Sequence, residues 1–322
     1  MIIKELKGGS LSKTAVELHN GEQFVRKYIS KSDNREYGLV RWQSQIRKLQ
    51  VMAQAVGADV TPKIISIGYL KNDYYYDIEY FDNAETVLDY LLASQKKEEA
   101  KHVFLNLMGV IERYKKIHFG SIKGAFSLYI QEEIGSVLNE VLDISDGLNL
   151  SYEELIKIHE LCDVSLTLIK KNESFLQGIE LVESLTHGNL TLENTMVDNT
   201  GSIKLIDLYA ETYCESWLGD ISQLMQSCIG DYELINDLDE SAFGCIFTEI
   251  EILDSSIAYL EFRALLNEHT SKLSLQERIV VDIFYASQFI RMFPFKRSGT
   301  PRKAFYFLVQ GLSKLNRVLN QC

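Results

Sequence analysis

The feature that most constrains this chain is a polar loop followed by two short strands, between Leu185 and Leu208. The loop runs from His187 to Asn194, and the strands are expected over residues 195–197 and 202–206. Two β-prone runs joined by a short polar turn that contains glycine are typical of a β-hairpin. A hairpin here places Asn194, just before the first strand, beside Asp207, just after the second.

The side chains at the two ends of this hairpin have the chemistry of a magnesium site. Asn194 offers an amide oxygen and Asp207 offers a carboxylate. These are hard oxygen ligands of the kind that Mg²⁺ prefers, and protein-bound Mg²⁺ usually keeps waters and substrate phosphates in its remaining positions. The alternative interpretation is an ordinary hairpin that carries polar residues by chance.

Taken together, these residues resemble the catalytic core of the kinase-fold small-molecule phosphotransferases, the aminoglycoside phosphotransferase and choline kinase group. The pattern of that group is H-G-D-x-x-x-x-N, followed by a strand that ends in Ile-Asp. Here the loop reads H-G-N-L-T-L-E-N, and the later strand ends in Ile206-Asp207. The resemblance implies that Asn194 and Asp207 hold Mg²⁺ and that ATP is the phosphoryl donor.

One position of the pattern differs in its chemistry. The family has an aspartate in the loop that accepts the proton of the acceptor hydroxyl, and this chain has Asn189 there. An amide does not take a proton at neutral pH, so the usual general base is replaced. Asn189 and Asp207 are the candidate catalytic residues, with Asn189 expected to orient the acceptor rather than to deprotonate it.

The first 80 residues read as an antiparallel sheet with one helix. β-prone runs separated by turns predict five strands, and apolar residues at three- and four-residue steps predict a helix over residues 35–56. In the family, such a sheet carries a glycine-rich loop and a lysine that contact the nucleotide phosphates. Gly8, Gly9 and Ser10 match the loop, and Lys27 matches the lysine. A plain hairpin turn and a solvated strand lysine are the alternatives.

Three further positions complete the predicted nucleotide site. The helix over residues 35–56 has Gln45 where the family has a glutamate that pairs with the strand lysine. Glu79 and Phe81 fall at the expected hinge, where the backbone in this fold meets the adenine ring. A plain strand end is the alternative interpretation of the hinge. Two carboxylates of the family pattern are therefore amides in this chain, at residues 45 and 189.

The expected fold class is α+β, a two-lobed protein-kinase-like fold with a small antiparallel β lobe and a large, mainly helical lobe. The predicted division places the β-rich nucleotide-binding lobe at residues 1–80 and the helical lobe at residues 81–322, with the catalytic-loop hairpin at 185–208. Three-four apolar periodicity predicts helices through most of the second lobe, including one over residues 239–253.

The segment from Lys296 to Lys303 contrasts with the rest of the chain because it is rich in cations. Two interpretations are open: a contact for an anionic small-molecule acceptor or a partner, and a solvated connection between helices.

Composition excludes several other classes. The 322 residues carry a net charge of −12, which argues against general nucleic-acid affinity. No run approaches the ~20 apolar residues of a membrane helix. The N-terminus lacks the apolar segment and cleavage site of a secretory signal, so a cytoplasmic protein is expected. Five scattered cysteines without a C-x-x-C pair favour neither structural zinc nor a disulfide framework.

Two functional hypotheses follow. The first is an ATP- and Mg²⁺-dependent phosphotransferase that acts on a hydroxyl of a small molecule, with a sugar or surface-polysaccharide precursor as one acceptor class. The second is a catalytically impaired, nucleotide-binding pseudokinase that acts through a protein partner. A helical scaffold without a nucleotide site is a third and weaker interpretation.

Overall fold

The computed structural model describes residues 1–6, 12–31, 35–144, 149–210, 213–252 and 255–322. Contacts within the chain divide it into two compact units. Unit 1 comprises residues 1–90, 102–117 and 187–212, and unit 2 comprises residues 91–101, 118–186 and 213–322. The predicted hairpin therefore belongs to the same unit as the N-terminal strands. The division predicted at residue 80 stays a prediction.

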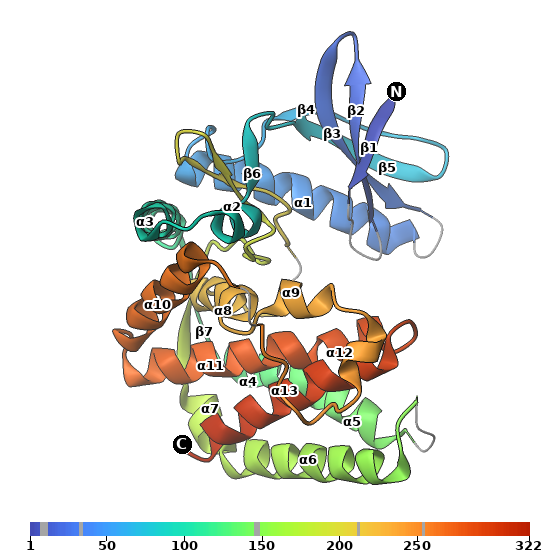
Figure 1. Cartoon of the computed structure of the whole chain (residues 1–322), viewed down its shortest axis with the longest axis vertical. Coiled ribbons are helices and arrows are strands. Elements are labelled where there is room, and N and C mark those ends of the chain that lie inside the picture. The colour runs from blue at the N-terminus through green and yellow to red at the C-terminus, as the bar shows by residue number, and fades with distance from the viewer. Residues whose placement is uncertain (7–11, 32–34, 145–148, 211–212, 253–254) are drawn as a thin grey trace. The chain divides into compact units, whose positions relative to one another are not determined.

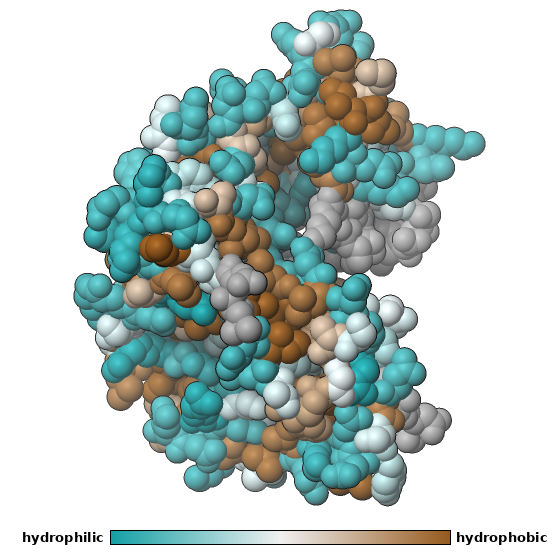
Figure 2. Space-filling model, viewed as in Figure 1, coloured by the Kyte–Doolittle hydropathy of each residue, from teal (hydrophilic) through white to brown (hydrophobic). Residues whose placement is uncertain are grey.

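Unit 1 is built on the five-stranded antiparallel sheet that the turn pattern predicted (Figure 1). The strand order is β1-β2-β3-β5-β4. Its strands are β1 (Ile2–Leu6), β2 (Ser12–His19), β3 (Glu22–Ser30), β4 (Ile64–Tyr69) and β5 (Asp73–Glu79). Strand alternation separates neighbouring cations on β3, because Arg26 binds Asp77 at 2.6 Å while Lys27 is only 7% exposed. Apolar side chains gather over this sheet on the face seen in Figure 2.

A long helix, α1 (Arg35–Val56), packs against β3 and β5 of the sheet. The approach is close at Gly38, where a Cβ atom would lie 2.7 Å from the carbonyl oxygen of Ser30. One turn later, Trp42 stacks on Tyr74 and donates its indole N–H to the carbonyl of Tyr75 at 2.9 Å. These contacts fix which face of α1 is turned toward the sheet.

A second, three-stranded sheet completes unit 1, with the order β10-β9-β6. It consists of β6 (Ala84–Thr86), β9 (Thr195–Asp198) and β10 (Ile203–Leu205). The predicted hairpin is confirmed, since β9 and β10 pair antiparallel with Thr195 opposite Leu205. The backbone N–H of Leu205 also donates to the carbonyl of Val60 at 2.8 Å, which ties the hairpin to the segment after α1.

Unit 2 is mainly helical, with one two-stranded antiparallel ribbon of β7 and β8. Helices α2 and α3 each contribute residues to both units. The bounds of these elements are α2 (Val87–Ala93), α3 (Lys97–Tyr114), β7 (His118–Lys123), α4 (Ala125–Ile130), the π-helical η1 (Gln131–Gly135), α5 (Ser136–Leu142), α6 (Tyr152–Lys171), α7 (Glu173–Gly178), β8 (Glu180–Ser184), α8 (Trp217–Cys228), α9 (Tyr232–Asn236), the 3₁₀-helical η2 (Glu240–Phe243), α10 (Ile257–Ser271), α11 (Leu275–Ile290), α12 (Met292–Lys296) and α13 (Pro301–Leu319).

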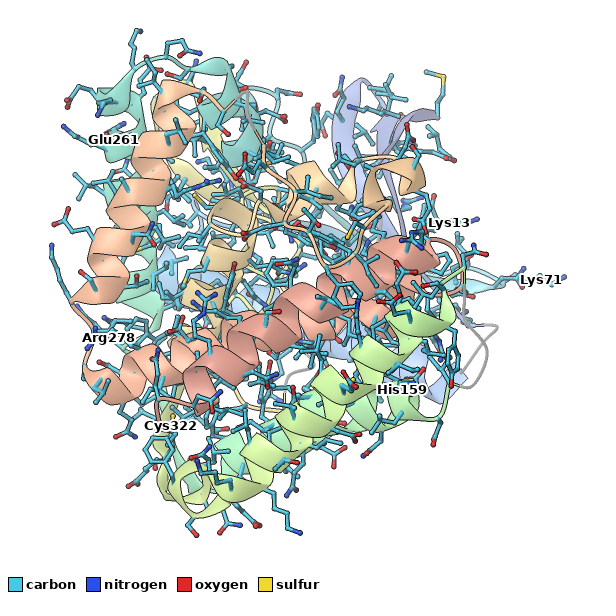
Figure 3. The ribbon with its side chains drawn as sticks, turned by 60° about the horizontal axis from the view of Figure 1, so that its bottom comes forward. Lys13, Lys71, His159, Glu261, Arg278 and Cys322 are labelled. Atoms are coloured by element: carbon cyan, nitrogen blue, oxygen red, sulfur yellow. The ribbon has the colours of Figure 1, made fainter. Side chains whose placement is uncertain are left out.

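The core of unit 2 is formed by α11 and α13, with α6 along the outer side of α13 (Figure 3). Gly311 permits the close crossing of α11 and α13, because a Cβ atom there would lie 2.8 Å from the carbonyl oxygen of Ala286. The Ser165 hydroxyl donates to the Asn316 side chain at 2.7 Å between α6 and α13. No helix in the described part of the chain has the length and apolar run needed to cross a membrane.

The α+β fold class is confirmed, but the helix predicted over residues 239–253 is wrong. Among residues 239–252, which the structure describes, the short η2 is the only helix, and the carbonyls of Phe243 and Gly244 accept hydrogen bonds from the guanidinium of Arg302 at 2.7 Å each. The backbone N–H of Ile250 donates to the hydroxyl of Tyr306 at 3.1 Å. Side chains of α13 thus satisfy backbone groups that a continuing helix would have paired internally.

Candidate active site

Asp207 lies where the sequence predicted it, at the end of the second hairpin strand. The backbone N–H of Ile206 donates to the carbonyl of Asn194 at 3.0 Å, so the two predicted metal ligands flank the end of the β9–β10 ladder. Asp207 has a φ of +55°, a left-handed conformation that non-glycine residues seldom adopt. This conformation turns the backbone sharply after β10, and the Asp207 side chain remains 40% exposed.

Lys27 forms an ion pair with Asp207, although the two residues are 180 positions apart in the chain. Burial alone would lower the pKa of Lys27, but the carboxylate of Asp207 outweighs burial and holds it above the ordinary value. Burial would likewise raise the pKa of Asp207, whereas Lys27 holds it below the ordinary value. Both groups are therefore charged throughout the neutral range.

Gln45 is linked to this ion pair through Tyr76. In the antiparallel register of β3 and β5, Tyr76 is the partner of Lys27, and its hydroxyl donates to the Gln45 side-chain oxygen at 3.1 Å. Burial is the main cause that raises the pKa of Tyr76, so its hydroxyl stays protonated. Gln45 thus fixes Tyr76 beside Lys27, and the countercharge of Lys27 comes from Asp207.

The polar loop is held by hydrogen bonds among its own residues. The backbone N–H of Asn189 donates to Nδ1 of His187 at 3.2 Å, and the carbonyl of Asn189 accepts from Nδ2 of Asn194 at 3.0 Å. The second bond orients the Asn194 amide, which leaves Oδ1 as the atom able to bind a cation. Among the residues that the structure describes, the side chain of Asn189 has no hydrogen-bond partner.

Gly188 allows the loop to approach the segment after Asp207. Its φ is +80°, and a Cβ atom at this position would lie 2.2 Å from the carbonyl oxygen of Tyr209. That carbonyl accepts a hydrogen bond from Nζ of Lys48, a buried side chain of α1. The backbone N–H of Tyr209 donates to the carbonyl of His187 at 2.9 Å. The loop, the segment after β10 and α1 are therefore joined at one point.

His187 is a neutral part of this junction. It is fully buried, and burial followed by the nearby charge of Lys48 lowers its pKa to about 3. Because Nδ1 accepts the N–H of Asn189, the geometry assigns the ring proton to Nε2. An imidazole in this state supports the loop backbone and is a poor proton acceptor.

Acidification is expected to destabilise the protein through His187. The folded-state pKa is about 3 and the ordinary value is 6.5, so between these values only the unfolded chain binds the proton. The contribution of neutral His187 to the free energy of unfolding is then fully present above pH 6.5. It falls by about 1.4 kcal/mol for each pH unit as the pH drops toward 3. Urea unfolding from pH 4.5 to 7.5 should show a shallower pH slope in His187→Gln. An equal slope in the parent and in His187→Gln would contradict this account.

The remaining predicted nucleotide-site residues divide into two groups. Gly8, Gly9 and Ser10 lie outside the described residues. Glu79 ends β5, and its side chain accepts the backbone N–H of Lys63 at 3.2 Å. Phe81 follows two residues later, with Nζ of Lys204 at 5.7 Å from its ring centre. Their contact with a nucleotide stays a prediction.

The basic segment from Lys296 to Lys303 and the neighbouring Arg291 are engaged within unit 2. Each cation contacts an acidic side chain or an asparagine, which favours a structural role over contact with an anionic acceptor. The pairs are Arg291 with Glu133, Arg297 with Glu140, Arg302 with Glu154, Lys296 with the side chain of Asn236, and Lys303 with the backbone carbonyl of Asn236.

Three residues near Asp207 were missed from the sequence: Arg41, Lys48 and Tyr76. Positions 41 and 48 share a helix face with Gln45, so the i, i+4, i+7 spacing was a usable signal. Tyr76 could be found only from the register between β3 and β5. Residues 74 to 76 are three consecutive tyrosines, so the sequence alone does not say which of them lies beside Lys27.

The donor set at the hairpin end has the chemistry that Mg²⁺ prefers, and its role as a metal site stays a prediction. Among the described residues there is no group of three or more His, Cys, Asp and Glu side chains that could hold a metal ion. One carboxylate and one oriented amide oxygen suit a cation that takes its other ligands from waters and substrate phosphates. Asp207 is exposed enough to be reached by such a cation.

Comparison with known proteins identifies the fold of the chain. No protein-family model and no curated protein matches the sequence. Among solved structures, the GDP complex of a point mutant of aminoglycoside 2′-phosphotransferase-IIIa superposes with a TM-score of 0.56 at 12% identity, covering 100% of this chain and 93% of that one. Two further structures match at lower TM-scores. Spectinomycin phosphotransferase with ADP and spectinomycin has a TM-score of 0.48 at 14% identity, covering 99% of this chain and 93% of that one. Choline kinase from Cryptosporidium parvum has a TM-score of 0.45 at 14% identity, covering 99% of this chain and 90% of that one.

The first of these similarities establishes the fold of the chain. It spans essentially the whole of both proteins, so the likeness is not confined to one motif. The chain therefore has the two-lobed, protein-kinase-like fold predicted from its sequence, and in fold it resembles the kinase-fold small-molecule phosphotransferases.

Proposed function

We propose that this protein is a nucleotide- and Mg²⁺-dependent phosphotransferase, with ATP as donor and a hydroxyl of a small molecule as acceptor. The observation that carries the proposal is the Lys27–Asp207 ion pair, formed at the open end of the β9–β10 hairpin, where Asn194 also lies. A buried cation, an exposed carboxylate and an oriented amide oxygen meet within unit 1. These are the groups needed to hold a polyphosphate and its metal.

Each residue has a distinct part in the proposed reaction. Lys27 binds phosphate oxygens, and Asp207 with Asn194 would hold Mg²⁺. The metal supplies neutralisation of the charge that builds up on the transferred phosphoryl group. Gln45 and Tyr76 keep Lys27 in place through their hydrogen bond. The acceptor oxygen bonds to the γ-phosphorus while the bond to the β,γ-bridging oxygen breaks, which releases ADP.

This chain differs from the family pattern in the step that removes the proton of the acceptor hydroxyl. Asn189 can donate or accept a hydrogen bond with the acceptor hydroxyl but cannot take its proton. Phosphoryl transfer passes through a loose transition state and depends mostly on positioning and charge stabilisation, so the proton can leave late, to solvent. Loss of a general base lowers the rate by about 10²- to 10⁴-fold. The proposed phosphotransferase is therefore a slow enzyme.

The identity of the donor and the acceptor rests on resemblance. The structural match with a TM-score of 0.56 is a complex with GDP, so GTP is tested beside ATP. A sugar or surface-polysaccharide precursor is the first acceptor class to screen. The test of the proposal is a calorimetric titration of the parent protein with ATP and with GTP, with and without Mg²⁺. Magnesium-enhanced binding of ATP or of GTP supports the proposal. A parent protein that binds neither nucleotide rejects the proposal.

A second candidate function is a nucleotide-binding protein that has lost catalysis and acts through a protein partner. The amide at Asn189 is the observation that favours it, because the proposed ligands Asn194 and Asp207 are both present. The two candidates agree on nucleotide binding and differ on turnover.

Asn189→Asp is expected to raise phosphoryl transfer by about 10²- to 10⁴-fold, because it restores a carboxylate base. Phosphate transfer from labelled nucleotide to a panel of hydroxyl acceptors measures this. Measurable transfer by the parent identifies the enzyme. Transfer by the variant alone favours the non-catalytic candidate. Asn199→Asp, which adds the same charge at an exposed position of the hairpin turn, is the matched control and should leave the rate unchanged.

A further inference from the structure

Arg41 lies on α1, one turn before Gln45, and faces the segment that follows Asp207. The guanidinium carbon of Arg41 is 5.8 Å from the ring centre of Tyr209. Its Nε atom is buried and has no hydrogen-bond partner among the described residues. Tyr209 is two residues after Asp207, so Arg41 is placed beside the ion pair of the proposed site.

An arginine in this position has unused binding capacity. A guanidinium carries five N–H donors in a planar fork, and buried donors in native proteins are nearly always paired. Contact with the face of the Tyr209 ring stabilises the positive charge of Arg41 in part. It does not supply hydrogen-bond acceptors for the N–H groups. The fork matches oxygens of phosphate or carboxylate groups, which can accept two of its hydrogen bonds at once.

The charges around Arg41 favour an anion with several negative charges. Lys27, Arg41 and Lys48 are three cations, and Asp207 is the carboxylate to which Lys27 is paired. Arg41 lies close enough for its charge to act on both members of that pair. On the helix face that the family uses for a glutamate, this chain has the neutral Gln45 between two cations.

We propose that Arg41 binds a phosphate group of the nucleotide, beside Lys27. This inference rests on the proposed function and adds to it a residue that the sequence pattern does not contain. Because Arg41 supplies positive charge from the protein, part of the affinity for the polyphosphate is independent of Mg²⁺. The contribution of Arg41 should grow with the number of phosphates on the ligand and vanish for the nucleoside.

The test is calorimetric titration with ATP, ADP and adenosine, each in EDTA and in Mg²⁺. Arg41→Gln is compared with the parent and with Arg47→Gln, which removes the same charge from an exposed position of the same helix. In EDTA, Arg41→Gln is expected to weaken ATP binding by about 10- to 100-fold, the effect of losing charge-assisted hydrogen bonds. Adenosine binding should change by less than about twofold, and Arg47→Gln should behave as the parent.

The outcomes separate this inference from the proposed function. Parent protein that binds neither ATP nor GTP rejects both, and a parent that binds GTP alone is titrated with GTP, GDP and guanosine in place of the adenine series. Parent protein that binds ATP, with Arg41→Gln within twofold of it, rejects the role of Arg41 alone. An equal loss in Arg47→Gln also rejects it, because the effect would then be one of overall charge. If Arg41→Gln fails to fold by circular dichroism, Arg41→Lys decides: it keeps the charge without the fork and should bind ATP several-fold more weakly than the parent, and parent-like binding by Arg41→Lys rejects the role.

Discussion

Asp207→Ala is expected to abolish magnesium-dependent nucleotide binding and phosphoryl transfer. The substitution removes the carboxylate of the proposed metal site and leaves Lys27, which is 7% exposed, without its countercharge. Loss of residues that only support a metal ligand costs 10- to 100-fold in affinity, so loss of the ligand itself should cost at least about 100-fold. Calorimetry with ATP and Mg²⁺ measures this loss.

The same substitution should also lower the free energy of unfolding, by about 1–3 kcal/mol. This is less than the ~3–5 kcal/mol for breaking a fully buried pair, because Asp207 is 40% exposed and its charge is partly screened. A double-mutant cycle with Lys27→Met isolates the pair from other effects. Asp163→Ala, at an exposed position of α6, is the control for loss of one negative charge. Parent-like affinity in Asp207→Ala would overturn the assignment of the site.

Gly188→Ala is expected to destabilise the loop by about 2 kcal/mol or more and to reduce nucleotide binding with it. An alanine must adopt a φ near +80°, which costs ~1–2 kcal/mol, and its Cβ atom would lie 2.2 Å from the carbonyl oxygen of Tyr209. Either the loop or the segment after Asp207 must move. Movement of either one separates Asn194 from Asp207, so binding and stability should fall together. Thermal unfolding and ATP titration report the two effects.

The chain provides a matched control for the steric part of this prediction. Gly21 has a φ of +84°, and no heavy atom lies within 4 Å of a Cβ built there. Gly21→Ala therefore carries the same backbone cost without the collision. The excess destabilisation of Gly188→Ala over Gly21→Ala measures the close approach to Tyr209. Equal destabilisation of the two variants would show that the approach is not constraining.

The parts of the fold that the sequence predicted are those governed by local pattern. Alternating residues and turns define the five strands of unit 1, and the Asp198 to Gly201 turn between two β-prone runs defines the hairpin. In the helical unit the same reasoning failed over residues 239–253. The apolar spacing there is real, since Phe243 and Ile246 are fully buried, but Arg302 from α13 takes the carbonyls of Phe243 and Gly244. A contact from a residue so distant in the chain has no local signal.

The candidate site shows the same division. Asn189, Asn194 and Asp207 were predicted because they fit a loop-and-strand pattern that can be read along the chain. The partner of Gln45 could not be predicted, since it depends on the pairing of two strands, and the pairing of Lys27 with Asp207 depends on how the hairpin meets the sheet within unit 1. The contacts of Arg41 and Lys48 depend on how α1 is rotated against the sheet, which the packing of Gly38 and Trp42 fixes.

The separation of Lys27 from Asp207 by 180 residues also has a consequence for biosynthesis. Residues 118–186, which belong to unit 2, are synthesised between the strands of unit 1 and the hairpin. At about 5–20 residues per second, the ribosome reaches Asp207 some 10–40 s after Lys27. During that interval the nascent sheet contains a lysine whose carboxylate partner does not yet exist. The five-stranded sheet therefore either forms before the ion pair or forms only after Asp207 has been synthesised. In both cases the site is completed late in the synthesis and folding of the chain.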